Sequence, residues 1–430
     1  NGHATDGARL LPGGEAGADA ISNATQTQTQ TQDQAMLNPT YSADDPVLGR
    51  VSFRDRKRTL WALSVAYPLV PFLGIAGHFF SGHALWLLLP LLTGYVGGPL
   101  LDARMGEDQS NPPEAAVPQL EADRYYRWIN YAVVPVLWGS LLFNCIFVAT
   151  HELSWMAWLA TTIITGSMLG FGLNLSHELG HKKDWLGRKL GLFNSALGGY
   201  GHFSIEHNRG HHRHVATAED PASSKMGETI YRFVFREMPG AFFRAWDLET
   251  ERLERQGQSP WSLNNEIIQA GLVTLGLYGG LIAAFGPKMV PVLAVVAFWG
   301  AFQLTSANYI EHYGLLRRKL PDGRYERCEP HHSWNSNHII SNLIVFHLQR
   351  HSDHHANPTR SYQSLRNFPE LPTLPSGYFG MFLAAYVPPI WFAIMDKRVI
   401  AATGGDVKRI NFLPAQRARL MRQFGLREQP

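Results

Sequence analysis

The sequence predicts an all-α integral membrane protein with about six transmembrane helices and a cytoplasmic helical cap rich in histidine. Six long apolar runs and 19 histidines, most of them in tight groups, support this prediction. Charged residues make up only 17% of the chain and the net charge is +3, so nucleic acid is not a favoured partner. The high aromatic content, with 12 tryptophans, is typical of a membrane–water interface.

Each apolar run has about the 20 residues that a helix needs to cross roughly 30 Å of hydrocarbon. A soluble bundle of long buried helices is the alternative, but the grouping of the runs into three close pairs favours a membrane domain. The predicted transmembrane runs are residues 59–80, 84–103, 129–150, 155–176, 264–285 and 289–311.

Lysine and arginine are unevenly distributed around these runs. They cluster before the first run, between the second and third, and after the fourth and sixth, whereas the other three connections are short and nearly uncharged. The positive-inside rule therefore predicts that both termini are cytoplasmic, together with the polar regions 177–263 and 312–396.

The remaining segments complete the predicted organisation. Residues 1–46, with a TQTQTQTQ tract, read as a disordered tail, residues 47–396 as the membrane domain, and residues 397–430 as a basic cytoplasmic tail. The apolar stretch 376–395 is split by Pro388-Pro389, which favours an interfacial or re-entrant segment over a seventh span. Two cysteines, Cys145 and Cys328, are too few for a disulfide framework or a four-cysteine metal site.

Four clusters contain nine of the histidines. Three pairs have i, i+4 spacing, which places both rings on one face of a helix where they can bind one metal ion. The fourth cluster is a single histidine at the end of the sixth run. The candidate metal ligands are His177, His181, His207, His211, His212, His312, His351, His354 and His355.

The positions of the clusters predict a single site. Runs four and six end at the same membrane face, so their terminal histidines can converge with the two polar clusters. Burying nine imidazoles without a metal would leave many polar groups unsatisfied. One ion cannot use nine ligands, whereas two ions with four or five each would do so, and imidazole suits zinc, copper and iron.

Four carboxylates stand beside these histidines: Glu178, Glu206, Glu311 and Asp353. Each is a candidate to accept a hydrogen bond from the outer ring N–H of a ligating histidine, although a solvated charge is an equal alternative. The other histidines, including His331 and His332, are interpreted as hydrogen-bonding or solvated residues. Gly94, Gly97 and Gly98 thin the second run, where they either open a substrate channel or permit close helix packing.

The clusters HELGHK, EHNRGHH, NYIEHYGL and LQRHSDHH resemble those of the alkane 1-monooxygenases. The resemblance extends from about residue 50 to residue 400. It implies a bacterial cytoplasmic-membrane enzyme in which the nine histidines hold two non-haem iron ions. It further implies terminal hydroxylation of a medium-chain n-alkane by O₂, with electrons from rubredoxin and its reductase.

Three alternatives remain at this point. A desaturase or hydroxylase acting on an acyl chain shares a looser histidine pattern, and the HYG element favours the alkane and xylene hydroxylases over it. A zinc protease built on His177, Glu178 and His181 would leave the other clustered histidines unexplained. A membrane metal carrier more often places its ligands midway through the spans. The basic residues after Lys397 suit either an acidic electron donor or anionic lipid.

Overall fold

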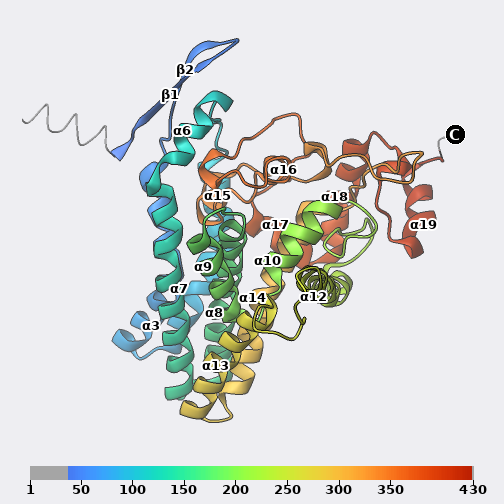
Figure 1. The fold of residues 1–430 in the computed structure, drawn as a ribbon. Coiled ribbons are helices and arrows are strands. Elements are labelled where there is room, and N and C mark those ends of the chain that lie inside the picture. The colour runs from blue at the N-terminus through green and yellow to red at the C-terminus, as the bar shows by residue number, and fades with distance from the viewer. Residues whose placement is uncertain (1–36, 429–430) are drawn as a thin grey trace, which may run out of the picture. The chain divides into compact units, whose positions relative to one another are not determined.

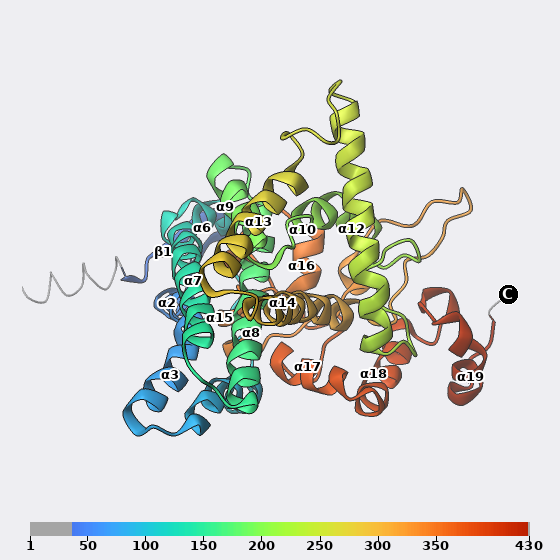
Figure 2. The ribbon, with the colours of Figure 1, turned by 90° about the horizontal axis from the view of Figure 1, so that it is seen from below.

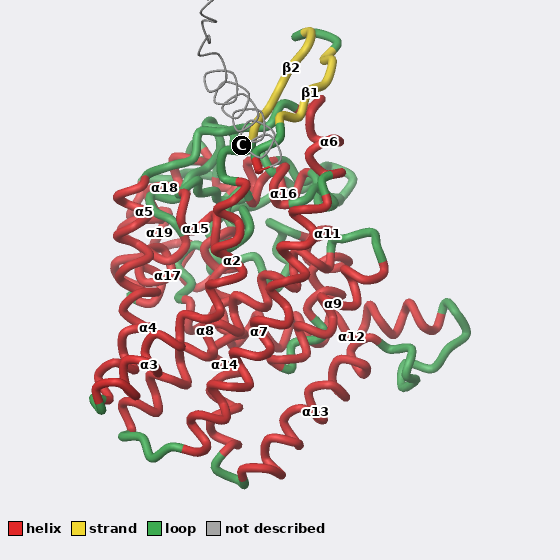
Figure 3. Tube along the Cα trace, turned by 90° about the vertical axis from the view of Figure 1, so that its left-hand side faces the viewer, coloured by secondary structure: helices red, strands yellow, loops and turns green. Residues whose placement is uncertain are grey.

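The computed structural model describes residues 37–428 (Figure 1). Helices form almost all of the regular structure, and within this range the only strands are β1 and β2 (Figure 3). The chain divides into two compact units: Asn1–Leu60 with Pro113–Gln119, and Trp61–Pro112 with Leu120–Pro430.

The first unit contains an antiparallel hairpin of β1 (Thr40–Asp45) and β2 (Gly49–Arg54). The Asp45 carboxylate closes the turn by accepting the backbone N–H groups of Val47 and Leu48, both at 2.9 Å. Thr40–Asp45, within the predicted tail 1–46, thus pairs with β2 along its whole length. Residues 1–36 of that predicted tail lie outside the described part of the chain.

Six helical segments of the described chain are long and apolar enough to cross a membrane, which confirms the six predicted runs. Polar caps begin three of them: Asp123, Ser154 and Asn265 each accept a backbone N–H from the first turn. The segments are Arg58–Ser81, Ala84–Met105, α7 (Arg124–Thr150), α8 (Trp155–Gly180), α13 (Glu266–Phe285) and α14 (Met289–His312).

The first two segments are composite, because prolines at the start of several pieces interrupt the backbone hydrogen bonds. The first consists of η1 (Arg58–Trp61), α2 (Ala62–Ala66), η2 (Tyr67–Leu69) and α3 (Val70–Ser81). The second consists of η3 (Ala84–Leu88), α4 (Leu89–Leu92), η4 (Thr93–Gly97) and α5 (Gly98–Met105).

Helices α8 and α14 pack closely because small residues line their contact. A Cβ atom at Gly170 would lie 2.5 Å from the Cβ of Gln303, and one at Gly300 would lie 2.6 Å from the side chain of Leu169. This contact brings the ends of the two helices together where both carry candidate ligands.

Shorter helices follow and precede these spans. They are η5 (Glu114–Ala116), α6 (Val117–Ala122), α9 (Trp185–Ser195), η6 (Ala196–Gly198), α10 (Phe203–Ile205), η7 (Glu206–His211), α11 (His212–His214), α12 (Ile230–Glu254), η8 (Pro330–His332), α15 (Ile339–Ile344), α16 (His351–Ala356), η9 (Tyr362–Ser364), α17 (Tyr378–Tyr386), α18 (Pro388–Thr403), η10 (Val407–Arg409) and α19 (Pro414–Phe424). Helices α17 and α18 meet at a bend of 119°, so the apolar stretch broken by Pro388 is a broken span or a re-entrant segment.

The C-terminal residues are part of the second unit. Phe412 and Leu420 belong to a buried cluster that also contains Tyr309 and Ile310 of α14 and Trp391 of α18. Helix α18 runs across the predicted boundary at residue 396. Residues 397–428 therefore continue the folded unit rather than forming a separate tail.

Candidate metal centre

The structure brings all nine candidate histidines together, and they form two groups. The elements that carry them are the end of α8, the consecutive helices η7 and α11, the end of α14, and α16. The five-histidine group contains His177, His181, His207, His212 and His354. The four-histidine group contains His211, His312, His351 and His355.

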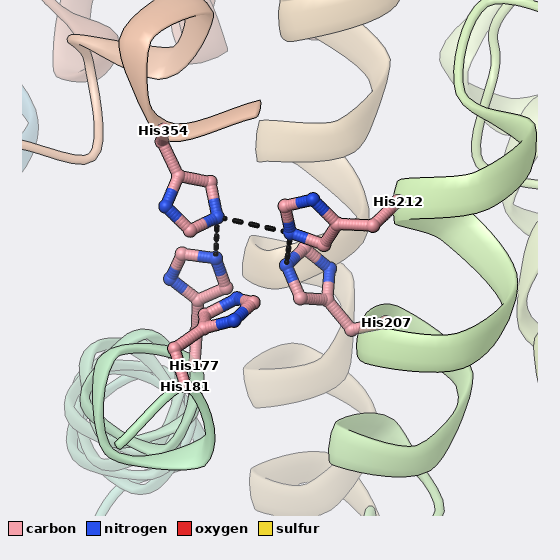
Figure 4. Close-up of side chains that lie close together, drawn as sticks. All are labelled: His177, His181, His207, His212 and His354. Carbon is pink, nitrogen blue, oxygen red and sulfur yellow. Dashed lines mark hydrogen bonds between the residues drawn. The ribbon is translucent and has the colours of Figure 1, made fainter. Parts of the chain in front are cut away.

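In the five-histidine group the rings converge from four elements, α8, η7, α11 and α16 (Figure 4). The Nε2 atom of His354 lies 2.9 Å from that of His177 and 3.1 Å from that of His212. The Nε2 atoms of His212 and His207 are 3.0 Å apart. One nitrogen from each of the five rings lies within 4.8 Å of all the others.

The four-histidine group has the same kind of geometry and is fully buried. The Nε2 atom of His351 lies 3.1 Å from that of His312 and 2.9 Å from that of His355. The two groups are adjacent, since the ring centroids of His212 and His355 are 4.5 Å apart.

The pair His207 and His211 does not share one group, although its i, i+4 spacing predicted that it would. The reason is that η7 is a π-helix, in which about five residues rather than four return to the same face. His207 therefore aligns with His212 at i, i+5, and His211 points to the other group. The pairs His177–His181 and His351–His355 each stay within one group, as their spacing predicted.

The donor set fits metal ions. Two nitrogens bound at about 2.1 Å and at right angles to each other would be about 3 Å apart, as the closest Nε2 pairs are. The Nε2 atoms of His181 and His211 are buried without a hydrogen-bond partner, which is costly unless an ion binds there. The five nitrogens of one group can thus hold one metal ion, and the four nitrogens of the other group can hold a second ion.

Asp220 contacts the outer side of the centre, and the sequence did not single it out. Its carboxylate accepts hydrogen bonds from His211 Nδ1 at 2.9 Å, Ser223 Oγ at 2.7 Å and Arg244 at 2.8 Å. The Asp220 contact fixes the His211 tautomer, with the proton on Nδ1 and the lone pair of Nε2 facing the group. Arg244 also donates to Glu206, so one guanidinium joins both carboxylates.

Three of the four predicted outer carboxylates have other partners among the described residues. Glu178 accepts from Lys182 and from the Tyr362 N–H, Glu206 accepts from Arg244, and Asp353 pairs with Arg360 at 2.9 Å. No hydrogen bond to a histidine of either group is found for them. Adjacency in sequence did not predict contact, because neighbouring side chains on a helix point in different directions.

Glu311 is the exception. Its Oε2 atom lies 3.4 Å from His351 Nε2, and its Oε1 atom accepts a 2.7 Å hydrogen bond from the Tyr378 hydroxyl. The contact is with the nitrogen that faces the group rather than with the outer nitrogen. Glu311 is therefore placed on the ligand side of the four-histidine group.

His211 differs electrostatically from the histidines of the five-histidine group. Burial is the main cause that lowers the pKa of His181, His207, His212 and His354, which keeps these rings neutral and available to bind a cation. Burial also opposes the charged form of His211, but attraction and hydrogen bonding to Asp220 outweigh it and raise the pKa of His211.

A third group, formed by Glu326, His331 and His332, lies in the loop after α14. His332 Nδ1 accepts the Glu329 N–H at 2.9 Å, so its ring proton is on Nε2, which donates to Glu326 at 3.1 Å. This histidine is satisfied without a metal, in agreement with its interpretation as a hydrogen-bonding residue.

An apolar cavity approaches the centre from between the spans. At one end its lining includes Tyr95, Ser167 and Gln303. At the other end it includes Asn174 and Leu348, and each of these two lies three residues before a candidate ligand. Tyr378, which binds Glu311, also lines it. The cavity thus extends along the spans towards the histidines.

Comparison with known proteins agrees with this geometry. The model of the fatty acid desaturase family matches residues 153–393, more than half of the chain. Alkane 1-monooxygenase 1 of Alcanivorax borkumensis is 52% identical over 87% of this chain and 92% of its own length. Alkane 1-monooxygenase of Ectopseudomonas oleovorans is 53% identical over 86% of this chain and 92% of its own length.

The xylene/toluene monooxygenase hydroxylase component XylM of Pseudomonas putida is more distant, at 29% identity over 77% of this chain and 86% of its own length. The spans, the two histidine groups and the extent of the match to the curated relatives lead to one conclusion: this chain belongs to the alkane 1-monooxygenases.

Proposed function

We propose that the protein hydroxylates the terminal carbon of a medium-chain n-alkane at two iron ions held by the nine histidines. The convergence of five and four imidazole nitrogens beside an apolar cavity is the observation that supports this proposal. The reaction consumes one O₂, two electrons and two protons, and it yields one primary alcohol and one water. Iron bound at both groups would supply the activation of O₂.

The cavity would position the alkane. Ser167 lies 10 residues before His177 on α8, and Gln303 lies 9 residues before His312 on α14. Either spacing is a distance of about 14–15 Å along the helix. A medium-chain alkane could extend from this polar end to the histidines. Apolar walls between these ends exclude water and hold the chain end-on, so that one terminal carbon faces the centre.

Of the three glycines in the second span, Gly94 supports a channel. It lines the cavity, and a Cβ atom there would meet nothing within 4 Å. Gly98 instead permits close packing, since its Cβ would lie 3.1 Å from the Phe379 ring, and Gly97 approaches only the Leu92 carbonyl.

A substitution at Gly94 tests the cavity. Gly94→Phe should shorten the longest alkane that is hydroxylated, because the ring would fill the cavity between its ends. The measurement is product formation across an alkane series by gas chromatography. Gly139→Phe is the control, since Gly139 is exposed on α7 and does not line the cavity. An unchanged length profile in Gly94→Phe would contradict this position of the substrate.

The electron donor that we propose is rubredoxin, supplied by its reductase. An opening in the second unit is lined by Arg213, Arg317 and Arg327 and reaches His212 and His355, one ring from each group. An acidic donor would be attracted there and would come close to both ions. Arg213→Glu with Arg327→Glu should raise the KM for rubredoxin with little change in kcat at saturation. The control Arg422→Glu, on α19, should leave this KM unchanged.

The direct test uses the full chain in lipid, loaded with iron and given rubredoxin, reductase, NADH and octane. Formation of 1-octanol is the expected result. A second candidate is an acyl-chain desaturase or hydroxylase, which the match to the desaturase family model favours. Oxidation of a fatty acyl substrate without 1-octanol would select that candidate. About one zinc per chain and no iron would select a zinc protease instead.

The proposed location is the bacterial cytoplasmic membrane, with both termini and the histidine-rich cap in the cytoplasm. The charge asymmetry between the connections supports this orientation. It would put the arginine-lined opening on the side where a soluble cytoplasmic donor is found.

A further inference from the structure

Helix α12 is apolar on two faces. One face is buried and packs Ile230, Phe233 and Val234 against the cluster that contains Phe302 and Ile310 of α14. The other face is exposed although it is aromatic. Tyr231, Phe235 and Phe242 are 50%, 79% and 40% exposed, and Trp246 is partly exposed.

The exposed aromatic residues form one stripe. At 100° per residue, positions 231, 235, 242 and 246 fall within a narrow sector on one side of the helix. A soluble surface rarely exposes such a row, which marks a binding face. Tyrosine, phenylalanine and tryptophan are the residues that favour the membrane interface.

Helix α12 runs across the direction of the spans. Figure 1 shows it end-on, whereas α7 and α8 are upright, and Figure 2 shows it lengthwise while α14 is seen nearly end-on. It is also too polar to qualify as a span among the described helices. This is the orientation of a helix that lies in the plane of a bilayer.

The contact with α14 gives the depth of α12. Glu237 of α12 accepts hydrogen bonds from Thr305 at 2.8 Å and Asn308 at 3.0 Å. These residues lie 16 and 19 positions after Met289, where α14 begins. At 1.5 Å per residue they are about 24–29 Å along the helix, close to the roughly 30 Å thickness of the hydrocarbon.

The same apolar surface continues beyond the helix. Trp246 packs against Trp261, with ring centroids 4.8 Å apart, and Trp261 is 77% exposed. Helix α13, a membrane span, then begins at Glu266, and its Leu272 and Leu275 are exposed as well. The stripe is therefore continuous with a surface that lipid covers.

We propose that α12 is an in-plane membrane anchor whose aromatic stripe lies in the lipid headgroup region. Its opposite face carries Arg244, which holds Asp220 against His211. One helix thus joins the bilayer surface to the histidine centre and fixes the depth of the centre relative to the bilayer. This inference depends on the fold alone and not on the identity of the substrate or metal.

Spin labels test this position in the full chain, reconstituted in nanodiscs of phosphatidylethanolamine and phosphatidylglycerol. The background carries Cys328→Ser and retains Cys145, which is 1% exposed. Labels at Phe235→Cys and Phe242→Cys are compared with Glu251→Cys, an exposed polar position on the same helix. Power-saturation measurements give the access of O₂, which is enriched in lipid, and of water-soluble nickel-EDDA.

We expect access to nickel-EDDA to be several-fold lower, and access to O₂ higher, at Phe235 and Phe242 than at Glu251. Equal access of nickel-EDDA to all three labels would overturn the proposal. Exclusion of both reagents, with dipolar broadening between labels, would also overturn it, because the stripe would then lie against a second copy of the chain.

A second measurement keeps an aromatic residue at every position of the stripe. Lipids brominated near the headgroup should quench tryptophan fluorescence more in the native chain than in Trp246→Phe with Trp261→Phe, because the variant lacks the two interfacial indoles. Equal quenching of both proteins would contradict the anchor. Comparable elution and Tm values of all variants serve as the folding control.

Discussion

The two histidine groups differ in the charge that surrounds them. The five-histidine group brings together imidazoles, whereas the four-histidine group also contacts the carboxylates of Asp220 and Glu311. Neutral imidazoles leave the charge of a bound cation uncompensated, whereas carboxylates offset it. Two ions bound side by side would therefore differ in affinity and in reduction potential, although histidine supplies most ligands to both.

Removal of one ligand from each group should give the largest effect. His312→Ala should lose the ion of the four-histidine group, and His181→Ala the ion of the five-histidine group, because each leaves a buried coordination position empty. Metal content should fall from two ions to one in either variant, and hydroxylation should be lost. Iron analysis and 1-octanol formation are the measurements.

His338→Ala is the control for both variants, since His338 lies outside the two groups and bonds Ser336. It should keep both ions and its turnover. If His312→Ala kept both iron content and turnover, the single histidine at the end of α14 would not be a ligand.

Asp220→Asn should weaken one group selectively. The amide can no longer supply the negative charge behind His211, and loss of such a partner typically costs about 10- to 100-fold in metal affinity. Competition with a chelator should show that one ion per chain is bound more weakly than in the native protein and that the affinity for the other ion is unchanged. Asp353→Asn is the matched control, because this buried carboxylate pairs with Arg360 rather than with a histidine of the groups.

The sequence predicted the membrane spans and the nine converging histidines, because hydropathy and i, i+4 spacing are local properties. It did not predict how the histidines divide. The π-helix that separates His207 from His211 changes the helical period by one residue, and nothing in the letters EHNRGHH indicates this change.

Asp220 was missed for a different reason. It lies nine residues after His211 beyond a turn, and tertiary packing against Arg244 on α12 brings its carboxylate to the ring. The predicted carboxylates were chosen by adjacency to a histidine, and only Glu311 of these contacts a group. Pairing between distant segments determines which carboxylates contact the centre, and a single sequence contains little information on it.

The metal-free protein should lose stability in acid. The folded pKa of His181, His207, His212 and His354 lies below the unfolded value of about 6.5, so the unfolded chain binds more protons below that pH. Stability is thus present above about pH 6.5 and falls as the pH decreases below it. Tm values of the metal-free protein between pH 8 and 5 measure this loss.

His211 of the four-histidine group should act in the opposite direction, whereas burial lowers the pKa of His351 and His355 in the same group. The folded pKa of His211 is raised, so this residue contributes stability at low pH that is lost as the pH rises through that value. Asp220→Asn removes the cause of the raised pKa of His211. The Tm of the metal-free variant should therefore decrease more steeply as the pH falls. An unchanged slope would show that His211 is not charged in the metal-free protein.

The smallest effect is expected for Gly210→Ala, which acts on the four-histidine group indirectly. A Cβ atom at Gly210 would lie 2.7 Å from Arg244 Nε, so the guanidinium would have to move away from Glu206 and Asp220. Asp220 would remain against His211 but lose one of its donors. We therefore expect a metal affinity only a few-fold weaker at this group and unchanged at the other.

Gly139→Ala is the control, because a Cβ atom there meets nothing within 4 Å. If Gly210→Ala weakened both groups equally, the added methyl group would act by shifting the π-helix, which carries His207 as well as His211. The difference between the groups would then depend on the register of one helix more than on the carboxylate behind one ring.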